Sequence, residues 1–258
     1  MAPRLLAATT SHKTEPLGTV IEVFGRLGLR DIELNLHHVL ELGEAPAEVR
    51  RMLEAAGVRA WVLAGGWCDF FHPQPAVRET FASIARQVEL AEFFGVDLLR
   101  VFFGRLRFDE YSADRRAAIV ENLTRLSDRH PAITFVFENH DGASLVPDVC
   151  RDVLARVDRP NIRMNFDPIN FVRGGAGVAH ALALLQPFIA HVHLKGLEQG
   201  DYCEFGVGDV DLAPMLRGLC AAGYGGSFSV EYEGRFDKTT RLYQSMRRAR
   251  AALETAGF

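Results

Sequence analysis

The alternation of apolar runs with helix-periodic segments is the feature that most constrains the fold of this chain. Runs rich in Val, Ile, Leu and Phe recur eight times, at 4–8, 30–36, 58–66, 96–104, 133–140, 161–168, 189–196 and 227–234. Segments with helical periodicity follow them, at 15–27, 45–56, 74–94, 113–129, 146–157, 178–187, 211–222 and 236–256. Strands and helices in such alternation predict right-handed βαβ units and therefore a parallel sheet.

Eight such units favour a closed (β/α)8 TIM barrel of the α/β class. A barrel of this kind typically needs about 250 residues, and the chain has 258. A doubly wound open sheet is the structural alternative, and it is less favoured because no G-x-G-x-x-G follows the first apolar run. No Pro/Gly/Ser-rich linker divides the chain, so we expect a single domain over residues 1–258.

Composition and charge disfavour several classes of function. The formal net charge of −4 and the lack of a basic stripe argue against a protein that binds nucleic acid through its phosphates. The first residues are too soon polar for a secretory signal, and no apolar run reaches the about 18 residues of a membrane span. Four scattered cysteines without C-x-x-C spacing are typical of buried thiols in a reduced compartment. We therefore expect a cytoplasmic protein that acts on a small molecule, with no nucleic-acid or membrane partner.

Four apolar runs in the second half of the chain each end in a hard metal ligand. These ligands are Glu138, Asp167, His193 and Glu231. Taken singly, each would more often be a cap, an ion-pair partner or a core residue. At the carboxyl ends of parallel strands, however, the four would converge, and three carboxylates in a low-dielectric pocket repel one another unless a cation lies among them. The set predicts one divalent metal ion, and Mn²⁺, Mg²⁺, Co²⁺ and Zn²⁺ suit it about equally.

Five short strings carry a family resemblance. They are Phe-Glu-Asn-His at 137–140, Asn-Phe-Asp-Pro-Ile-Asn at 165–170, His-Val-His-Leu-Lys at 191–195, Gly-Val-Gly-Asp-Val-Asp at 206–211 and Ser-Val-Glu-Tyr-Glu at 229–233. With them the chain resembles the xylose isomerase-like TIM barrels, which include sugar phosphate isomerases and epimerases, hydroxypyruvate isomerase, inosose dehydratase and endonuclease IV. The resemblance implies that Glu138, Asp167, His193 and Glu231 hold the ion, and that the two Glu also form the acid/base pair. A homodimer or homotetramer would fit the same family.

Further polar side chains are expected to surround the metal. His140 and Lys195 lie just beyond ligands on the same face of their strands, where they can donate hydrogen bonds to substrate oxygens. Glu233 shares a face with Glu231 and is either the rival ligand or a substrate contact. The other predicted substrate-binding residues are Asn170, Glu33 at the end of the second strand and Arg105 after the fourth. His191 is expected to orient a carboxylate or to lie in the core.

The resemblance implies an isomerase or epimerase of a small sugar, sugar phosphate or other hydroxy-carbonyl compound, and the chemistry of the predicted metal site is consistent with this activity. A metal that bridges a carbonyl and its neighbouring hydroxyl acidifies the proton on the α-carbon and stabilises the resulting cis-enediolate. Loss of a β-hydroxyl instead of reprotonation would make the enzyme a dehydratase, acting on an inosose- or dehydroshikimate-like substrate. Ketose 3-epimerases carry a His where this chain has Asn170, which disfavours that activity. A barrel that binds metal without catalysis is the third hypothesis.

Overall fold

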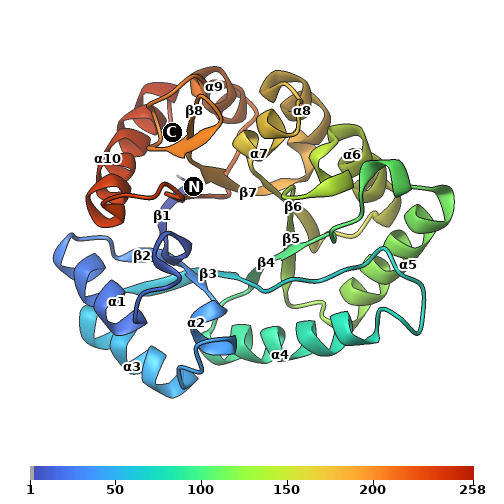
Figure 1. Cartoon of the computed structure of the whole chain (residues 1–258), viewed down its shortest axis with the longest axis horizontal. Helices are drawn as coiled ribbons and strands as arrows, with labels where there is room; N and C mark the ends of the chain where they lie inside the picture. The colour runs from blue at the N-terminus through green and yellow to red at the C-terminus, as the bar shows by residue number, and fades with distance from the viewer. Residues whose placement is uncertain (1–2) are drawn as a thin grey trace. The chain divides into compact units, whose positions relative to one another are not determined.

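A closed barrel of eight parallel strands forms the centre of the protein, as a computed structural model that describes residues 3–258 shows (Figure 1). The strand order around the barrel is β1-β10-β7-β6-β5-β4-β3-β2. The strands are β1 (Arg4–Ala8), β2 (Asp31–Asn35), β3 (Arg59–Ala64), β4 (Leu98–Phe102), β5 (Thr134–Glu138), β6 (Ile162–Phe166), β7 (Ile189–Leu194) and β10 (Ser227–Val230). Each lies within the apolar run that predicted it. The TIM barrel prediction is therefore confirmed.

Eight helices form where the periodicity predicts them. They are α1 (Leu17–Arg26), α3 (Pro46–Ala56), α4 (Arg78–Phe94), α5 (Ala113–Arg129), α6 (Pro147–Val157), α8 (Val178–Leu185), α9 (Ala213–Ala221) and α10 (Lys238–Ala256). Helices α3 and α4 end at Gly57 and Gly95, whose φ angles of 60° and 68° are the left-handed values that a glycine adopts without steric cost. Among residues 3–258, no helix is both long and apolar enough to cross a lipid bilayer.

Several short elements have no counterpart in the sequence prediction. They are the helices α2 (His37–Leu40) and α7 (Pro168–Arg173), the strands β8 (Gly196–Glu198) and β9 (Asp201–Cys203), and the 3-10 turns η1 (Thr9–His12), η2 (Phe108–Glu110), η3 (Gly142–Leu145) and η4 (Gln186–Phe188). Each is too short to show a hydrophobic period. The β8–β9 pair is an antiparallel hairpin whose turn places Gln199 and Gly200 at positive φ.

Side chains alternate between the two faces of each buried strand, and this alternation decides which residues face the site. In β5, Phe135, Val136 and Phe137 are completely buried, which is typical of a parallel strand covered on both faces. Phe102 of β4 lies in register with Glu138 of β5, so the two side chains leave the sheet on the same side. Between β7 and β10, His193 lies in register with Ser229.

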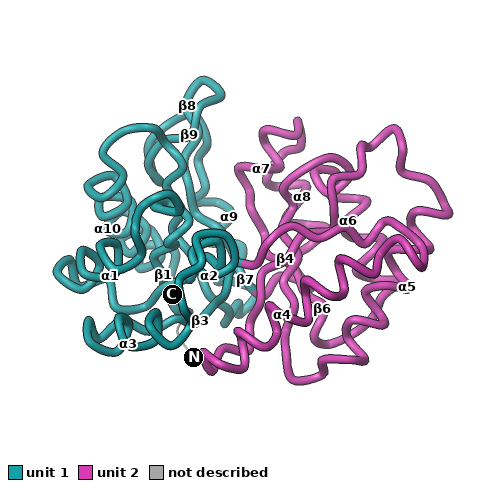
Figure 2. Tube along the Cα trace, turned by 60° about the horizontal axis from the view of Figure 1, so that its bottom comes forward, with its two compact units in different colours: residues 1–64, 191–258 teal, residues 65–190 magenta. Residues whose placement is uncertain are grey.

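The chain divides into two compact units by its internal contacts (Figure 2). Unit 1 consists of residues 1–64 and 191–258, and unit 2 of residues 65–190. Each unit has its own cluster of buried polar side chains at the ends of its strands. The expected single domain over residues 1–258 stays a prediction.

Two histidines of unit 1 that lie outside the barrel strands are also buried. His12 in η1 is 1% exposed, and its Nε2 lies 3.2 Å from the hydroxyl oxygen of Thr239. His38 in α2 is completely buried. Burial lowers the pKa of both side chains below the ordinary value. Their charged or titratable neighbours are Glu15 and Lys238 for His12, and Glu44, His37 and His12 for His38.

We expect the protein to become less stable as the pH falls below the ordinary His pKa of about 6.5. In that window the unfolded chain binds protons that folded His12 and His38 do not, so the free energy of unfolding decreases as the pH falls. His38→Leu removes one of these groups and should flatten the decline in urea unfolding measured from about pH 7 to about pH 5. His180→Leu, at a more exposed histidine, is the control. A decline as steep in the His38 variant as in the control would contradict this account.

Candidate metal and catalytic site

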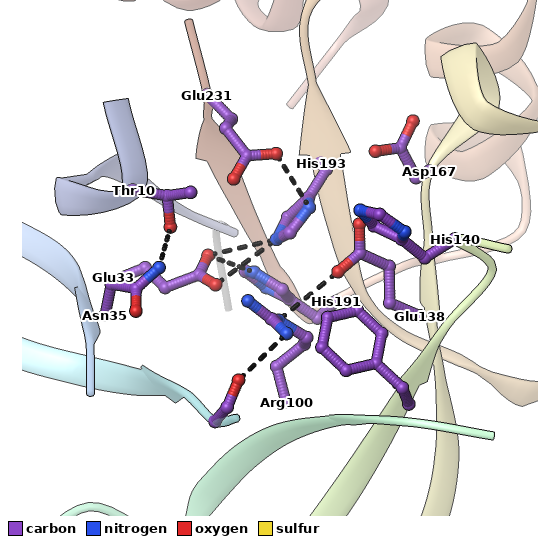
Figure 3. Close-up of polar contacts among 12 residues, drawn as sticks. Thr10, Glu33, Asn35, Arg100, Glu138, His140, Asp167, His191, His193 and Glu231 are labelled. Carbon is purple, nitrogen blue, oxygen red and sulfur yellow. Dashed lines mark hydrogen bonds and ion pairs between the residues drawn. The ribbon is translucent and has the colours of Figure 1, made fainter. Parts of the chain in front are cut away.

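Glu138, the last residue of β5, is held in place by two buried partners from unit 2. Its Oε2 lies 3.3 Å from Nε of Arg100 (Figure 3), and its Oε1 accepts a hydrogen bond from Nδ2 of Asn170 at 3.2 Å. Arg100 comes from the middle of β4, is 4% exposed and also donates to the backbone oxygen of Gly65. A guanidinium fixed in this way offsets part of the cost of burying the carboxylate.

Asp167 follows β6 and is completely buried. Its Oδ1 accepts hydrogen bonds from the backbone N–H groups of Ile169 and Asn170, at 3.0 and 2.9 Å, so the side chain caps α7. Asn139 makes two further bonds to the Asp167 backbone: Nδ2 donates to its carbonyl at 2.8 Å, and Oδ1 accepts from its N–H at 2.9 Å. These bonds hold the ends of β5 and β6 together, and bring carboxylate oxygens of Asp167 and Glu138 within 4.8 Å of each other.

His193 and Glu231 form the corresponding pair in unit 1. His193 is completely buried in β7, and its Nδ1 lies 3.4 Å from Oε2 of Glu231, which follows β10 and is 4% exposed. Lys195 donates from Nζ to the same oxygen of Glu231 at 2.8 Å and also to Oε1 of Glu233. Lys195 is buried, whereas Glu233 is a quarter exposed. Of the two rival Glu residues, Glu231 is therefore the one that faces His193.

Glu33 lies deeper than the sequence prediction places it. The prediction makes Glu33 a substrate contact at the end of the second strand, but its side chain is completely buried between two histidines (Figure 3). Burial by itself would raise the pKa of Glu33, but the adjacent imidazoles of His193 and His191 outweigh it and hold the pKa well below the usual range. His191, expected to orient a carboxylate or to lie in the core, does both.

His140 belongs to an aromatic wall at the end of the unit 2 strands. Its ring lies edge-on to Trp67 and Phe102, with centroids 5.3 and 5.2 Å apart, and Trp67 stacks on Phe102 at 4.3 Å. The guanidinium of Arg105 lies 3.5 Å from the centroid of Trp67, a cation–π contact. Trp67 is 43% exposed, so part of this wall is open to solvent. We name Trp67, Phe102, His140 and Arg105 together the aromatic wall.

The donor atoms in each unit fit a divalent cation. In unit 1, an imidazole nitrogen of His193 points toward a carboxylate oxygen, and in unit 2 two carboxylates lie close together. A cation would relieve the repulsion between the two carboxylates of unit 2, and it could be bound by the nitrogen and the oxygen of unit 1. Carboxylate oxygens and imidazole nitrogens are also ligands that first-row divalent metals and Mg²⁺ accept, without selecting one of them.

Sequence reasoning missed two residues that hold the candidate ligands, Arg100 and Asn139. For Arg100 a signal was present, because a charged residue inside an apolar strand requires a buried partner. Asn139 gave no such signal, since its role depends on the backbone of Asp167 on the neighbouring strand.

The chain belongs to the xylose isomerase-like TIM barrel family, whose sequence pattern matches residues 22–254. A 3-dehydroshikimate dehydratase of Bacillus anthracis is 25% identical over 117 residues, which cover 44% of this chain and 41% of that protein. The match thus spans less than half the length of this curated relative.

Solved structures of similar proteins share the fold. The probable 3-DHS dehydratase AsbF from Bacillus anthracis has a TM-score of 0.75 at 16% identity, covering 96% of this chain and 98% of its own. A D-tagatose 3-epimerase-like protein has a TM-score of 0.82 at 16% identity, with 98% of both chains covered. The IolI protein with a binding zinc atom has a TM-score of 0.80 at 17% identity, covering 98% of this chain and 97% of its own. Epimerases and dehydratases therefore both occur among proteins with this fold.

Arg100→Leu should lower the free energy of unfolding of the metal-free protein by about 3–5 kcal/mol, because it leaves the buried Glu138 carboxylate without its guanidinium. Urea denaturation followed by circular dichroism measures this change. Arg107→Ala removes an exposed arginine paired with Asp109 and should cost less than about 1 kcal/mol. Equal losses in the two variants would show that Arg100 does not stabilise Glu138.

Proposed function

We propose that this protein is a divalent-metal-dependent isomerase or epimerase of a small sugar, sugar phosphate or other hydroxy-carbonyl compound. One ion is held by Glu138, Asp167, His193 and Glu231. The observation that carries the proposal is that each of these buried residues offers one ligand atom, and that the four atoms lie within 4.8 Å of one another. Such a set is one that a divalent cation can bind.

Glu138 and Glu231 are the proton-transferring groups in this proposal. The ion, when bound, polarises a carbonyl group and acidifies the proton on the neighbouring carbon. A carboxylate then takes that proton, and the same or the other carboxylate returns a proton to carbon. Arg100 and Asn170 fix the direction of the Glu138 carboxylate, and Lys195 fixes that of Glu231, before any substrate arrives.

The aromatic wall is the proposed contact for the rest of the substrate. The exposed part of the Trp67 side chain suits an apolar contact with a sugar or a ring, and the imidazole of His140 can donate a hydrogen bond to a substrate oxygen. Lys195 is better placed to hold Glu231 and Glu233 than to reach a substrate, because it is buried between the two carboxylates.

A dehydratase is the second candidate. It is supported by the 25% identity with a 3-dehydroshikimate dehydratase over 117 residues. The first step is the same proton removal beside a carbonyl, but a β-hydroxyl then leaves as water and no proton returns to carbon. On this interpretation the substrate is a cyclic hydroxy-ketone related to dehydroshikimate.

Protein purified without a histidine tag should contain about one equivalent of a divalent metal by elemental analysis. The double variant Asp167→Ala, His193→Ala should contain little, because it loses two of the four proposed ligands. His180→Ala, at an exposed histidine, should keep the metal of the wild type. A wild-type protein that stays empty after soaking in Mn²⁺, Mg²⁺, Co²⁺ and Zn²⁺ would sink the proposal.

Metal-loaded enzyme in D₂O should place deuterium on a carbon of an isomerised or epimerised product, in a panel of ketoses and hydroxypyruvate, if the first candidate is right. Conversion of 3-dehydroshikimate to a dehydrated product would favour the second. In either case Glu138→Gln should lower kcat by at least about 100-fold, because it removes a proton-transferring group. Glu198→Gln, at an exposed Glu of β8, is the control. Bound metal without activity on any of these compounds would favour a barrel that has lost catalysis.

A further inference from the structure

We propose that Glu33, His191 and Ser227 form a buried hydrogen-bond relay that fixes the proton of His193 on Nε2 and so directs Nδ1 to the metal. The inference rests on the proposed metal site, but these three residues hold none of its four ligand positions. They are positioning residues that act through His193. All members of the relay belong to unit 1.

Glu33 contacts both rings through the same kind of nitrogen. Its Oε2 lies 3.0 Å from Nε2 of His191 and 3.2 Å from Nε2 of His193, and its Oε1 lies 3.3 Å from Nε2 of His193. The three side chains are completely buried. An ionised carboxylate accepts hydrogen bonds and donates none, so Nε2 of each histidine carries the hydrogen.

The second nitrogen of His191 is occupied by Ser227. Nδ1 of His191 lies 2.7 Å from the Ser227 hydroxyl, and the two residues are in register on β7 and β10. Because Nε2 of His191 donates to Glu33, a neutral ring accepts at Nδ1, and the serine hydroxyl is the donor. The relay thus runs from Ser227 through His191 to Glu33, with each hydrogen bond in one direction.

The second nitrogen of His193 is the one that faces Glu231, at 3.4 Å. With the proton of a neutral ring held on Nε2 by Glu33, the lone pair of Nδ1 is available to a metal ion on the Glu231 side. The opposite tautomer would place a hydrogen at Nδ1, which would donate to Glu231 and exclude the metal from that nitrogen. Glu33 therefore decides which nitrogen of His193 serves as ligand.

The need for a second histidine follows from the burial of Glu33. A completely buried carboxylate with a single donor carries a large desolvation cost, and a second donor offsets more of it. The spacing of His191 and His193 places both rings on one face of β7, with centroids 5.3 Å apart and planes at 86°, so both can turn an edge to one carboxylate. His191 thus stabilises and orients Glu33, and Glu33 orients His193.

A second metal ion is the competing interpretation of the same cluster. Ligand atoms of Glu33, His191 and His193 also lie within 4.8 Å of one another. An ion there would replace the hydrogens on the two Nε2 atoms, whereas the relay requires them. The two interpretations therefore predict opposite protonation at Nε2 and different metal stoichiometry.

The test combines histidine NMR with zinc titration of the whole protein. Long-range ¹H–¹⁵N spectra of ¹⁵N-histidine-labelled protein distinguish protonated from unprotonated ring nitrogens, with and without Zn²⁺. The wild type should bind one Zn²⁺ and keep Nε2 of His193 protonated in both states. Glu33→Gln should bind Zn²⁺ about 10- to 100-fold more weakly and lose the single His193 tautomer, because one amide oxygen cannot replace two carboxylate oxygens. Ser227→Ala should weaken Zn²⁺ binding less and change the signals of His191.

Ser245→Ala is the matched control, because it removes a different buried hydrogen bond of unit 1, the one from the Phe205 backbone. It should leave both the zinc affinity and the histidine spectra unchanged. Two bound Zn²⁺ in the wild type, with one lost in Glu33→Gln, would overturn the relay, as would unchanged spectra and affinity in both relay variants. If Glu33→Gln does not fold, Ser227→Ala decides. If the wild type binds none of Zn²⁺, Mn²⁺, Mg²⁺ and Co²⁺, the proposed function fails, and the relay is then tested by the spectra of the metal-free protein alone.

Discussion

The burial of carboxylates is the constraint on which the rest of this site depends. Glu33, Glu138, Asp167 and Glu231 are each at most 4% exposed. An ionised carboxylate in a protein interior loses hydration and needs compensating partners. The four receive them from four different sources: two imidazoles for Glu33, a guanidinium and an amide for Glu138, backbone N–H groups for Asp167, and an ammonium for Glu231.

Three of the residues that hold these acidic residues in place come from strands that neighbour the acidic residue's own strand in the sheet. Arg100 reaches Glu138 from β4 to β5, Asn139 reaches Asp167 from the end of β5 to the end of β6, and Lys195 reaches Glu231 from the end of β7 to the end of β10. The parallel ladder fixes these neighbours to within two residues of register. The barrel backbone thus brings each of these pairs close together, and the side chains need only be long enough to reach their partners.

The same physics explains what the sequence predicted and what it missed. Long periodic segments, such as the helix at 113–129, are visible because their apolar spacing repeats over several turns. Helix α7 spans only Pro168–Arg173 and is capped by the Asp167 side chain. The only sequence feature that indicates this helix is Asp167, which the sequence pattern predicts as a metal ligand instead. Glu33 lies inside an apolar run, which indicates that it is buried. Its partners His191 and His193 are about 160 residues away in sequence, and they come close to Glu33 only in the closed barrel.

The fold alone does not decide between isomerisation and dehydration. An epimerase-like protein and a probable dehydratase share this barrel with TM-scores of 0.82 and 0.75. Both reactions begin with removal of a proton beside a carbonyl, which needs the same acidic pair. They differ in what happens at the next carbon, where a hydroxyl either stays or leaves. In the proposed reactions that carbon is one bond farther from the proton-transferring groups, so we expect groups outside the ligand set, such as His140 and Trp67 of the aromatic wall, to distinguish the two outcomes.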